Sequence, residues 1–576
     1  MTGSPVLELL EAYRSGRKNP AEELTSRLRK IEAEGERPIW ISRFSEAAVL
    51  AQLEAADTAA PLYGVPFAVK DNIDVAGLPT TAACPEFSYL PARHASVVER
   101  LVQAGAIVIG KTNLDQFATG LVGTRTPYGS CSSVFDSRYI SGGSSSGSAV
   151  AVAKELVAFS LGTDTAGSGR VPAAFNALVG VKPTRGLLST RGVVPACRSL
   201  DCVSIFTKSV ADAGLLLELC AGFDADDAFS RERALVNALG DARPRLAVPR
   251  AEDLEFFGDD DSVELFLAAV ERAEGLGAEI SRFDLAPFRE AAALLYAGPW
   301  VAERLTVVAD LLAKNPEAVH PVVRGIALAG RGYSAEAAFR AQYRLGELRL
   351  RAQQVLANCD ALLLPTAPTQ YTIQEVLDNP LELNARLGTY TNFVNLLDLS
   401  ALAVPAGFKQ SGLSFGVTFM APAFHDERLL ELGRRFVGEP EHGSRPAHDC
   451  VWLAVAGAHL AGQPLNHELT SRGARRIRTT RTAAEYRLYA LDTVPPKPGL
   501  VHAPGEPAHA IEVEIWELTR EAFGSFVAQI PAPMTIGMTR LADGSVVKGF
   551  SCEPHALQGA REISQFGGWR AFRASA

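Results

Sequence analysis

The sequence predicts an α/β protein with a mixed β-sheet flanked by helices, followed by a smaller α+β domain that is mainly β. From Leu62 onward, short apolar runs such as "GVPFAVK", "AIVIGKTN" and "AFSLGTD" alternate with helical patterns such as "SVVERLVQAG". This alternation is typical of a sheet whose strands are joined by helices. Beyond residue 450, "EYRLYAL" and "IEVEIWEL" alternate in β fashion. At 576 residues, the chain also exceeds what a single core normally supports.

The elements follow in a definite order along the chain. Residues 1–60 contain two amphipathic helical patterns, "VLELLEAYRSG" and "AEELTSRLRKIEAEG", which predict a helical N-terminal arm. Long helical stretches run from about Asp260 to Asn358, and "ALLLPTAPT" and "LAVPAGF" are typical of strand ends. The helical pattern "RLLELGRRFVGE" closes a first domain at residues 1–439. The polar stretch 440–449 predicts a linker, and residues 450–576 form the second domain.

Composition and charge exclude several classes of function. The net charge of −9 argues against a basic surface that binds nucleic acid. No segment approaches the roughly 18 consecutive apolar residues that span a bilayer. The N-terminus lacks the basic and apolar regions of a signal peptide, so we expect a cytoplasmic protein. Small molecules and copies of the chain itself are the expected partners, with a homodimer favoured by base rate.

Cysteine and histidine spacing indicates neither a metal site nor a disulfide scaffold. No C-x-x-C pair and no H-E-x-x-H motif occurs, so we expect no metal and no cofactor. The eight cysteines are expected to be reduced and mostly buried; they are residues 84, 131, 197, 202, 220, 359, 450 and 552.

The stretch "SGGSSSGSAV", residues 141–150, has the composition of a linker but is followed directly by apolar sequence. Within it, Gly143–Gly147 fits the G-x-S-x-G nucleophile elbow, which would make Ser145 the nucleophile. An elbow needs an apolar strand before the serine, whereas "SSVFDSRYISGG" is polar, and no histidine lies between residues 95 and 319. The elbow is therefore disfavoured.

Lysine is the alternative base, provided that burial lowers its pKa. Lys70 ends the apolar run "LYGVPFAVK", which would direct it inward, although the position also fits a solvent-exposed strand end. A second cluster, "LGTDTAGSGRVPAAF", contains the small residues 165–168, whose backbone N–H groups can converge. Such a loop can form an oxyanion hole.

The motifs "GVPFAVKDN", "GKTNLDQFATG", "GGSSSGSAVAVA" and "LGTDTAGSGRVPAAFNALVGVKPTRG" resemble, in order and spacing, those of the amidase signature family, over residues 5–438. The resemblance implies amide hydrolysis by a Ser-cisSer-Lys triad. By position, Lys70 would be the base, Ser144 the bridging serine after a cis peptide bond, and Ser168 the nucleophile. The Gly-Ser stretch is then a reaction site rather than a linker.

The resemblance also implies how the nucleophile loop is built. The backbone amides of Thr165, Ala166, Gly167 and Ser168 would supply the oxyanion donors. Where the family often has Gly-Gly-Ser, this chain has Ala166-Gly167-Ser168 and, earlier, Ser145-Ser146-Gly147, and neither departure removes a reacting atom. We expect the flanking pair Asp164 and Arg170 to brace the loop.

Substrate specificity must come from residues outside the triad. The segment "LLYAGPWVAERL" places Tyr296 and Arg304 eight residues apart, about two helical turns and so on nearly the same helix face. A buried arginine at this place would suit a substrate carboxylate, which its planar fork can clamp. Without further context, Arg304 could equally pair with a surface acid while Tyr296 packs in the core.

This segment, "ATGLVGTRTPYG" and "LGTYTNFVNLLDLSALAVPAGF" resemble the allophanate hydrolases, a branch of the same family. The resemblance implies that Tyr296, Arg304 and Asn392 hold the carboxylate or ureide end of allophanate, with Gly123 lining the pocket. Asn395 is a neighbouring alternative to Asn392. It also implies other enzymes of urea or s-triazine breakdown as partners.

The second domain points to the same branch, because "LAVAGAHLAGQPLNHEL" resembles the first strand and the anion-binding loop of γ-glutamylcyclotransferase-like domains. Where the catalytic glutamate of those enzymes is expected, "AFGSFVAQIPAPMTIGM" contains no acid, so glutamyl cyclisation is not expected. In the branch, the first domain releases ammonia and the second decarboxylates N-carboxycarbamate. His459 and His467 are the candidates for that step; a structural role, or a domain that serves assembly, remains the alternative.

Three other functions stay open. The chain could hydrolyse another small carboxylated amide or ureide, which Arg304 would also suit. It could be the glutamine-hydrolysing component of a tRNA amidotransferase, although such a component normally lacks the C-terminal domain. A non-enzymatic scaffold is the least favoured, because Lys70, Ser144 and Ser168 are all present.

Overall fold

The computed structural model of the protein describes residues 5–35, 37–234, 236, 239, 243–440, 450–504 and 508–575. These residues form two compact units. One contains those up to Arg233 and from Pro244 to Pro440, and the other contains the described residues between 234 and 243 and those from Cys450 onward. The predicted linker, 440–449, lies outside the described residues except for Pro440. No helix in the described part of the chain is long and apolar enough to cross a membrane.

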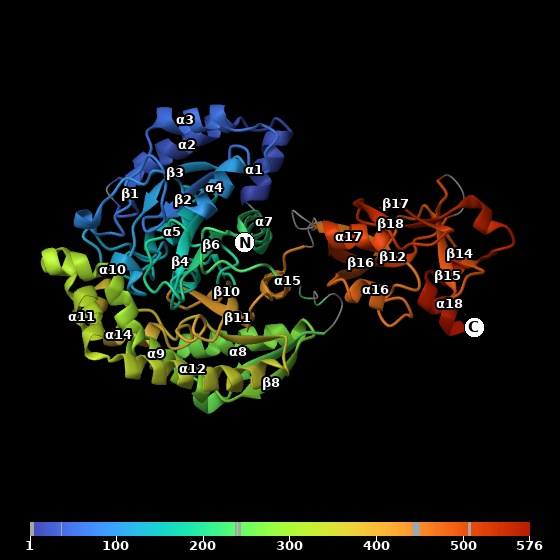
Figure 1. Cartoon of the computed structure of the whole chain (residues 1–576). Helices are drawn as coiled ribbons and strands as arrows, with labels where there is room; N and C mark the ends of the chain where they lie inside the picture. The colour runs from blue at the N-terminus through green and yellow to red at the C-terminus, as the bar shows by residue number, and fades with distance from the viewer. Residues whose placement is uncertain are drawn as a thin grey trace. The chain divides into compact units, whose positions relative to one another are not determined.

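The N-terminal segment contains three helices and one strand: α1 (Pro5–Arg14), α2 (Pro20–Ala33), β1 (Trp40–Arg43) and α3 (Glu46–Ala55). Asn19 caps α2 by accepting hydrogen bonds from the first backbone N–H groups of the helix. The sequence patterns predicted α1 and α2 but neither β1 nor α3. Because β1 pairs antiparallel with β3 (Ile107–Thr112), the segment also contributes the edge strand of the main sheet (Figure 1, blue).

The first unit is built on an eleven-stranded sheet in the order β1-β3-β2-β4-β6-β5-β10-β11-β9-β7-β8. The neighbours of β2 are parallel to it, as are those of β7, and the remaining pairs are antiparallel. The predicted mixed sheet flanked by helices is thereby confirmed. Its other strands are β2 (Pro66–Lys70), β4 (Phe159–Asp164), β5 (Val179–Lys182), β6 (Cys202–Thr207), β7 (Arg245–Pro249), β8 (Glu279–Phe283), β9 (Ala361–Pro365), β10 (Leu399–Phe408) and β11 (Ser414–Pro422).

Helices surround this sheet along its length (Figure 1). The stretch that was predicted as helical from about residue 260 to 358 is interrupted by β8, which pairs at the far edge of the sheet. The helices are α4 (Ser96–Gln103), α5 (Ser146–Ala153), α6 (Val171–Phe175), α7 (Val210–Cys220), α8 (Asp260–Gly275), α9 (Ala286–Tyr296), α10 (Trp300–Lys314), α11 (Pro321–Ala329), α12 (Ala335–Leu356), α13 (Ile373–Asp378), α14 (Glu382–Leu387) and α15 (Asp426–Val437).

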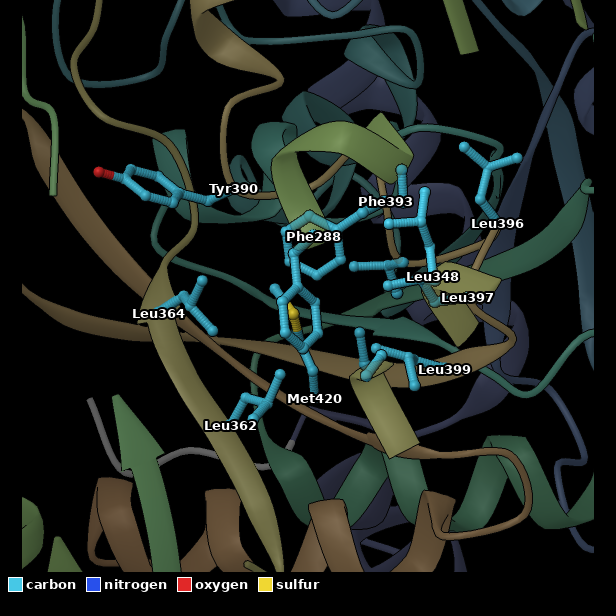
Figure 2. Close-up of a cluster of buried hydrophobic side chains, with 14 of the residues drawn as sticks. Phe288, Leu348, Leu362, Leu364, Tyr390, Phe393, Leu396, Leu397, Leu399 and Met420 are labelled. Carbon is cyan, nitrogen blue, oxygen red and sulfur yellow. The ribbon is translucent and has the colours of Figure 1, made fainter. Parts of the chain in front are cut away.

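A hydrophobic cluster packs α9 and α12 against the sheet (Figure 2). At its centre the rings of Phe288 and Phe393 meet edge to face, with centroids 5.3 Å apart. Buried Leu348 of α12 and Met420 of β11 belong to the same cluster. The cluster also includes Ala166, Cys197 and Leu200, so the loop after β4 and the loop before β6 pack against it.

The second unit has its own core, in which Leu453, Val513 and Trp516 are buried. It consists of a five-stranded sheet in the order β13-β16-β12-β18-β17 and a three-stranded sheet in the order β15-β14-β19. The predicted mainly-β fold is confirmed. Its elements are β12 (Cys450–Val455), α16 (His467–Thr470), β13 (Arg475–Arg481), β14 (Tyr486–Leu491), β15 (Lys497–His502), β16 (Glu512–Thr519), α17 (Arg520–Val527), β17 (Met534–Arg540), β18 (Val546–Cys552), β19 (Arg561–Glu562) and α18 (Trp569–Ser575).

Candidate active site

The candidate site lies at the carboxyl ends of β2 and β4. These strands are parallel neighbours, so their last residues, Lys70 and Asp164, are brought to the same edge of the sheet. Helix α5 packs against both strands, and the loop that precedes it brings Ser144 to that edge. The segment 141–150 is therefore a turn and helix start within the core, not a linker.

Lys70 is fully buried, and among the described residues the hydrogen-bond partners of its amine are two hydroxyl groups. Its Nζ lies 2.7 Å from Ser144 Oγ and 2.7 Å from Thr163 Oγ1. Burial lowers the pKa of Lys70 to about 7, and the carboxylates of Asp115, Asp201 and Asp164 oppose only part of that shift. The amine therefore exists substantially in its neutral form near pH 7 and can accept a proton.

Thr163 is a contact of Lys70 that the sequence reasoning missed. Its Oγ1 also accepts a hydrogen bond from Asn72 Nδ2 at 3.3 Å, and Asn72 is fixed in turn by the carbonyl of Val194 at 3.0 Å. Thr163 lies in a buried strand, where threonine is a common strand former, so no pattern marked it as part of a site.

The serines around Ser144 are all buried, and they differ in their partners. The peptide bond between Gly143 and Ser144 is cis, as predicted. Ser145 Oγ donates to the carbonyl of Thr163 at 3.2 Å and is thus engaged with the strand backbone. A nucleophile elbow requires a strand that leads directly into the serine. No strand lies in residues 132–145, so this requirement is not met at Ser145.

Ser168 lies in the loop that links β4 to α6, and 2 % of its surface is exposed. Its Oγ donates to the carbonyl of Gly120 at 3.4 Å rather than to Ser144. Catalytic hydrogen bonds are often long or poorly aligned before substrate binds, so this geometry leaves Ser168 a candidate nucleophile.

The predicted brace of the nucleophile loop is present. Arg170 Nε and Nη2 each lie 2.9 Å from a carboxylate oxygen of Asp164, and both side chains are fully buried. Asp164 also accepts from the N–H groups of Gly167 at 2.9 Å and Gly169 at 3.0 Å. One carboxylate thereby fixes both ends of the turn that presents Ser168.

This arrangement changes the set of oxyanion donors. The N–H of Gly167 was predicted as an oxyanion donor, but it donates to the carboxylate of Asp164 instead. In the part of the chain that the structure describes, the N–H groups of Thr165, Ala166 and Ser168 have no hydrogen-bond partner. These three groups are the ones left for a negatively charged oxygen.

Tyr296 and Arg304 are in contact, but not because they share a helix. Tyr296 ends α9 and Arg304 lies in α10, since Pro299 interrupts the helical pattern between them. Arg304 Nη2 donates to the Tyr296 hydroxyl at 3.3 Å, and its guanidinium lies 5.0 Å from the centre of the ring. The single-helix argument was wrong, and the two side chains meet through the packing of α9 against α10 instead.

Arg304 is 4 % exposed and is incompletely partnered. Its Nη1 donates to Thr119 Oγ1 at 3.1 Å, whereas its Nε has no hydrogen-bond partner among the described residues. Within the same residues, no carboxylate forms an ion pair with the guanidinium. Burial disfavours the charge of Arg304, whereas the nearby groups Tyr296, Asp201 and Glu303 raise its pKa. The guanidinium thus stays charged without a directly paired carboxylate, so this position favours binding of an anion. A small cavity borders it, lined by Thr119, Arg304 and apolar side chains such as Val308.

The other predicted pocket residues lie in different settings. The N–H of Gly123 donates to Asp115 at 2.9 Å, and a side chain at this position would meet Ser146. Asn395 is used within the fold, because its Nδ2 donates to the carbonyls of Asp164 and Leu200. Asn392 has a buried Oδ1 without a partner among the described residues, which leaves it the better candidate of the two.

In the second unit, His459 and His467 differ in environment. His459 packs against the rings of Phe550 and Phe526, with centroids 5.0 and 5.2 Å away, and those two rings also contact each other. Its Nε2 is 2.9 Å from Glu468 Oε2. Burial lowers the pKa of His459, although Glu468 opposes that shift. His467 is exposed, and its Nδ1 is 2.9 Å from the carbonyl of Pro464.

Comparison with known proteins shows the family of the chain. Residues 23–430 match the amidase family model, and residues 451–574 match the allophanate hydrolase C-terminal domain. The structure is similar to that of Kluyveromyces lactis allophanate hydrolase, with a TM-score of 0.79, 40% identity, and coverage of 100% of this chain and 99% of that one.

Curated relatives include longer proteins. The urea amidolyase of Saccharomyces cerevisiae is 42% identical over 92% of this chain, which spans 31% of that relative. A component of the glutamyl-tRNA(Gln) amidotransferase of Trichodesmium erythraeum is 34% identical over 66% of this chain and 85% of its own length. The chain belongs to the amidase family of amide-hydrolysing enzymes and carries a C-terminal domain of the allophanate hydrolase type.

Proposed function

We propose that the chain is an allophanate hydrolase, whose first unit releases ammonia from allophanate. The observation that supports this substrate most is Arg304, a buried guanidinium without an ion pair among the described residues. Allophanate carries a carboxylate two bonds from its reacting carbonyl carbon. The similarity to Kluyveromyces lactis allophanate hydrolase over the whole chain supports the same substrate.

In the proposed mechanism, Lys70 is the base and Ser144 relays its effect. Neutral Lys70 takes the proton of the Ser144 hydroxyl, while Ser144 takes that of Ser168, because a hydroxyl both donates and accepts. The freed Oγ of Ser168 then attacks the terminal carbonyl of allophanate. Ser168 has to turn from the Gly120 carbonyl toward Ser144 for this step, a rotation about one side-chain bond.

The remaining steps use the same groups. The N–H groups of Thr165, Ala166 and Ser168 stabilise the oxyanion of the tetrahedral intermediate. The relay returns a proton to the departing nitrogen, and ammonia leaves an acyl group on Ser168. Water then attacks the acyl carbon and loses a proton to the relay, so that N-carboxycarbamate is released.

We propose that the second unit decarboxylates this product. N-carboxycarbamate takes up one proton as a C–N bond breaks, and carbon dioxide and carbamate result. His459 is the side chain that we assign to this step, because it is largely buried, held by Glu468 and flanked by two aromatic rings. His467 is exposed and serves as the comparison residue.

The proposed partner is therefore a small anionic molecule, and we propose that the chain forms a homodimer. A component of a tRNA amidotransferase is the second candidate, supported by the similarity to such components of glutamyl-tRNA(Gln) amidotransferases over residues of the first unit. The complete C-terminal domain match opposes it. Ammonia release from allophanate but not from glutamine separates these two functions.

The test is ammonia release from allophanate by the wild type and by the variants Ser168→Ala, Ser145→Ala and Arg304→Gln. We expect Ser168→Ala to abolish release, Ser145→Ala to retain a measurable part of it, and Arg304→Gln to raise KM by at least about tenfold, since a charge-assisted bond is lost. Circular dichroism of each variant controls for folding.

The alternatives give different results. Turnover of malonamate or biuret in preference to allophanate would assign another carboxylated amide or ureide as substrate. Loss of activity in Ser145→Ala alone would refute the triad. A wild type that releases no ammonia from allophanate would refute the proposed substrate.

A further inference from the structure

The short segment Cys197–Asp201 lies between α10 and the nucleophile loop and is tied to both. At one end Glu303 accepts from the N–H of Ser199 at 2.7 Å, from its hydroxyl at 2.7 Å and from Cys197 Sγ at 3.0 Å. Glu303 immediately precedes Arg304 on α10. The segment is thus fastened to the helix at the residue beside the guanidinium.

At its other end the segment is fastened to the nucleophile loop. The buried carboxylate of Asp201 accepts from the hydroxyl of Thr165, the first residue of that loop. Asp201 also accepts from the N–H groups of Ala196 at 2.8 Å and Cys197 at 3.1 Å, which fix the carboxylate in its own turn. Asn395 adds a second tie, because one amide group donates to the carbonyls of both Asp164 and Leu200.

The segment and the nucleophile loop also pack into the same hydrophobic cluster. Ala166 of the loop and Cys197 and Leu200 of the segment all belong to the hydrophobic cluster that contains Phe288 and Phe393 (Figure 2). Close-packed interiors have little free volume, so a displacement of one element is passed to its neighbours rather than absorbed.

A second connection runs on the opposite side of Arg304. Its Nη1 donates to Thr119 Oγ1 at 3.1 Å, and the carbonyl of the next residue, Gly120, accepts from Ser168 Oγ at 3.4 Å. The guanidinium is therefore connected to the nucleophile through Thr119 and to the oxyanion loop through Glu303 and Asp201. The connection through Glu303 and Asp201 fixes the distance between the guanidinium and the loop, and the connection through Thr119 holds Ser168 until its hydroxyl turns toward Ser144.

We propose that Glu303 and Asp201 are positioning residues that hold Arg304 at a fixed distance from the nucleophile loop, and thereby select anionic amides by their length. This inference rests on the proposed function and adds the determinant of substrate length. One extra or missing methylene group is discriminated by about 10- to 200-fold in a closely fitting pocket, and we expect two anchoring points held at a fixed distance to give discrimination of this order. Neither residue touches substrate; each acts through its neighbour, Arg304 or Thr165.

The test uses dicarboxylates, whose binding does not depend on turnover. One carboxylate of malonate, succinate or glutarate pairs with Arg304, and the other accepts from the loop N–H groups. Calorimetry on the full chain gives Kd for each acid with the wild type and with Glu303→Gln and Asp201→Asn. We expect the wild type to prefer one length by at least about tenfold. We expect both variants to reduce that preference to within about threefold, because the anchoring points then shift independently.

Variants of Thr165 separate positioning from general damage. Thr165→Ser keeps the hydroxyl that donates to Asp201, so it should retain the length preference, whereas Thr165→Val should lose it. Asp227→Asn is the matched control, because Asp227 accepts from the N–H of Thr190 at 2.7 Å and of Phe229 at 3.0 Å and so caps another turn of the same unit. It should lower Tm and leave the preference unchanged.

Equal binding of the three acids by the wild type would overturn the inference. So would an undiminished preference in both Glu303→Gln and Asp201→Asn, or an equal loss of preference in Asp227→Asn. Ammonia release from allophanate is measured separately. A wild type that is inactive on allophanate but retains a length preference lost in the two variants would refute the proposed substrate and support the positioning role.

Discussion

Two buried lysines on neighbouring strands show what makes Lys70 suited to act as a base. Lys111 on β3 is as deeply buried as Lys70, and burial lowers its pKa as well, but its Nζ lies 3.1 Å from Asp71, which opposes that shift. The contacts of Lys70 are the hydroxyls of Ser144 and Thr163, which are neutral. The amine of Lys70 therefore loses its hydration without gaining a directly paired carboxylate. Its pKa falls to about 7, so the neutral amine is populated near pH 7.

The pH dependence of kcat/KM follows from this pKa. Because the neutral form of Lys70 is the active one, ammonia release should be low at pH 5, rise through about pH 7 with the slope of one ionisation, and level off above it. Steady-state rates between pH 5 and 9 check this. A rate that falls as pH rises through 7 would show that a protonated group is required instead.

At the level of elements, the nucleophile loop depends on one glycine. Gly167 has a φ of +140°, and a Cβ at this position would lie 2.4 Å from Thr391 Oγ1 and 2.8 Å from its Cβ. Gly167→Ala should therefore displace the loop between β4 and α6 and lower kcat by at least about 100-fold, the effect of losing one oxyanion donor. Rates and circular dichroism of the purified variant check this.

The matched control is the same substitution in helix α12. Gly346 is exposed, and a Cβ there would meet nothing within 4 Å. Gly346→Ala should raise the free energy of unfolding by about 1 kcal/mol without changing kcat, because alanine is the better helix former. Equal effects of the two substitutions on kcat would show that the loop conformation does not require glycine at 167.

The elements that the sequence predicted well are those with a local signal. The apolar run ending at Lys70 forms a buried strand, as its composition predicts. The Gly-Ser stretch forms a turn and the start of α5; its composition alone indicates a linker, and its match to a family motif indicated a site instead. The elements it missed depend on distant partners. Strand β1 is only four residues long and is defined by its pairing with β3. Tyr296 and Arg304 meet across two helices, because Pro299 interrupts a stretch whose spacing alone indicated one helix.

The same distinction applies to the candidate site. Lys70, Ser144 and Ser168 stand in recognisable motifs, and the structure brings Lys70 and Ser144 to hydrogen-bond distance. Asp201 follows the stretch "ACRSL", where an acid has no periodic signal. Its contact with Thr165 bridges 36 positions of the chain. Roles that arise from packing between segments are visible only once the fold is known.

At the scale of the whole molecule, each of the two compact units has a hydrophobic core of its own. The groups proposed for amide hydrolysis all lie in the first unit, and His459 and Glu468 lie in the second. Two separate cores imply that a substitution in one unit leaves the structure of the other intact. The two proposed steps should therefore be separable by mutation in the full chain.

The separating variant is His459→Ala, followed with ¹³C-labelled allophanate by NMR. Ammonia release at Ser168 should stay within about twofold of the wild type, because the two sites lie in units with separate cores. The signal of N-carboxycarbamate should accumulate in the variant, whereas His467→Ala should show no accumulation, since that ring is exposed. Parallel loss of both steps would show that the units act as one catalytic body. Unchanged consumption of N-carboxycarbamate in His459→Ala would show that His459 takes no part in the reaction. Its role would then be to pack against Phe526 and Phe550.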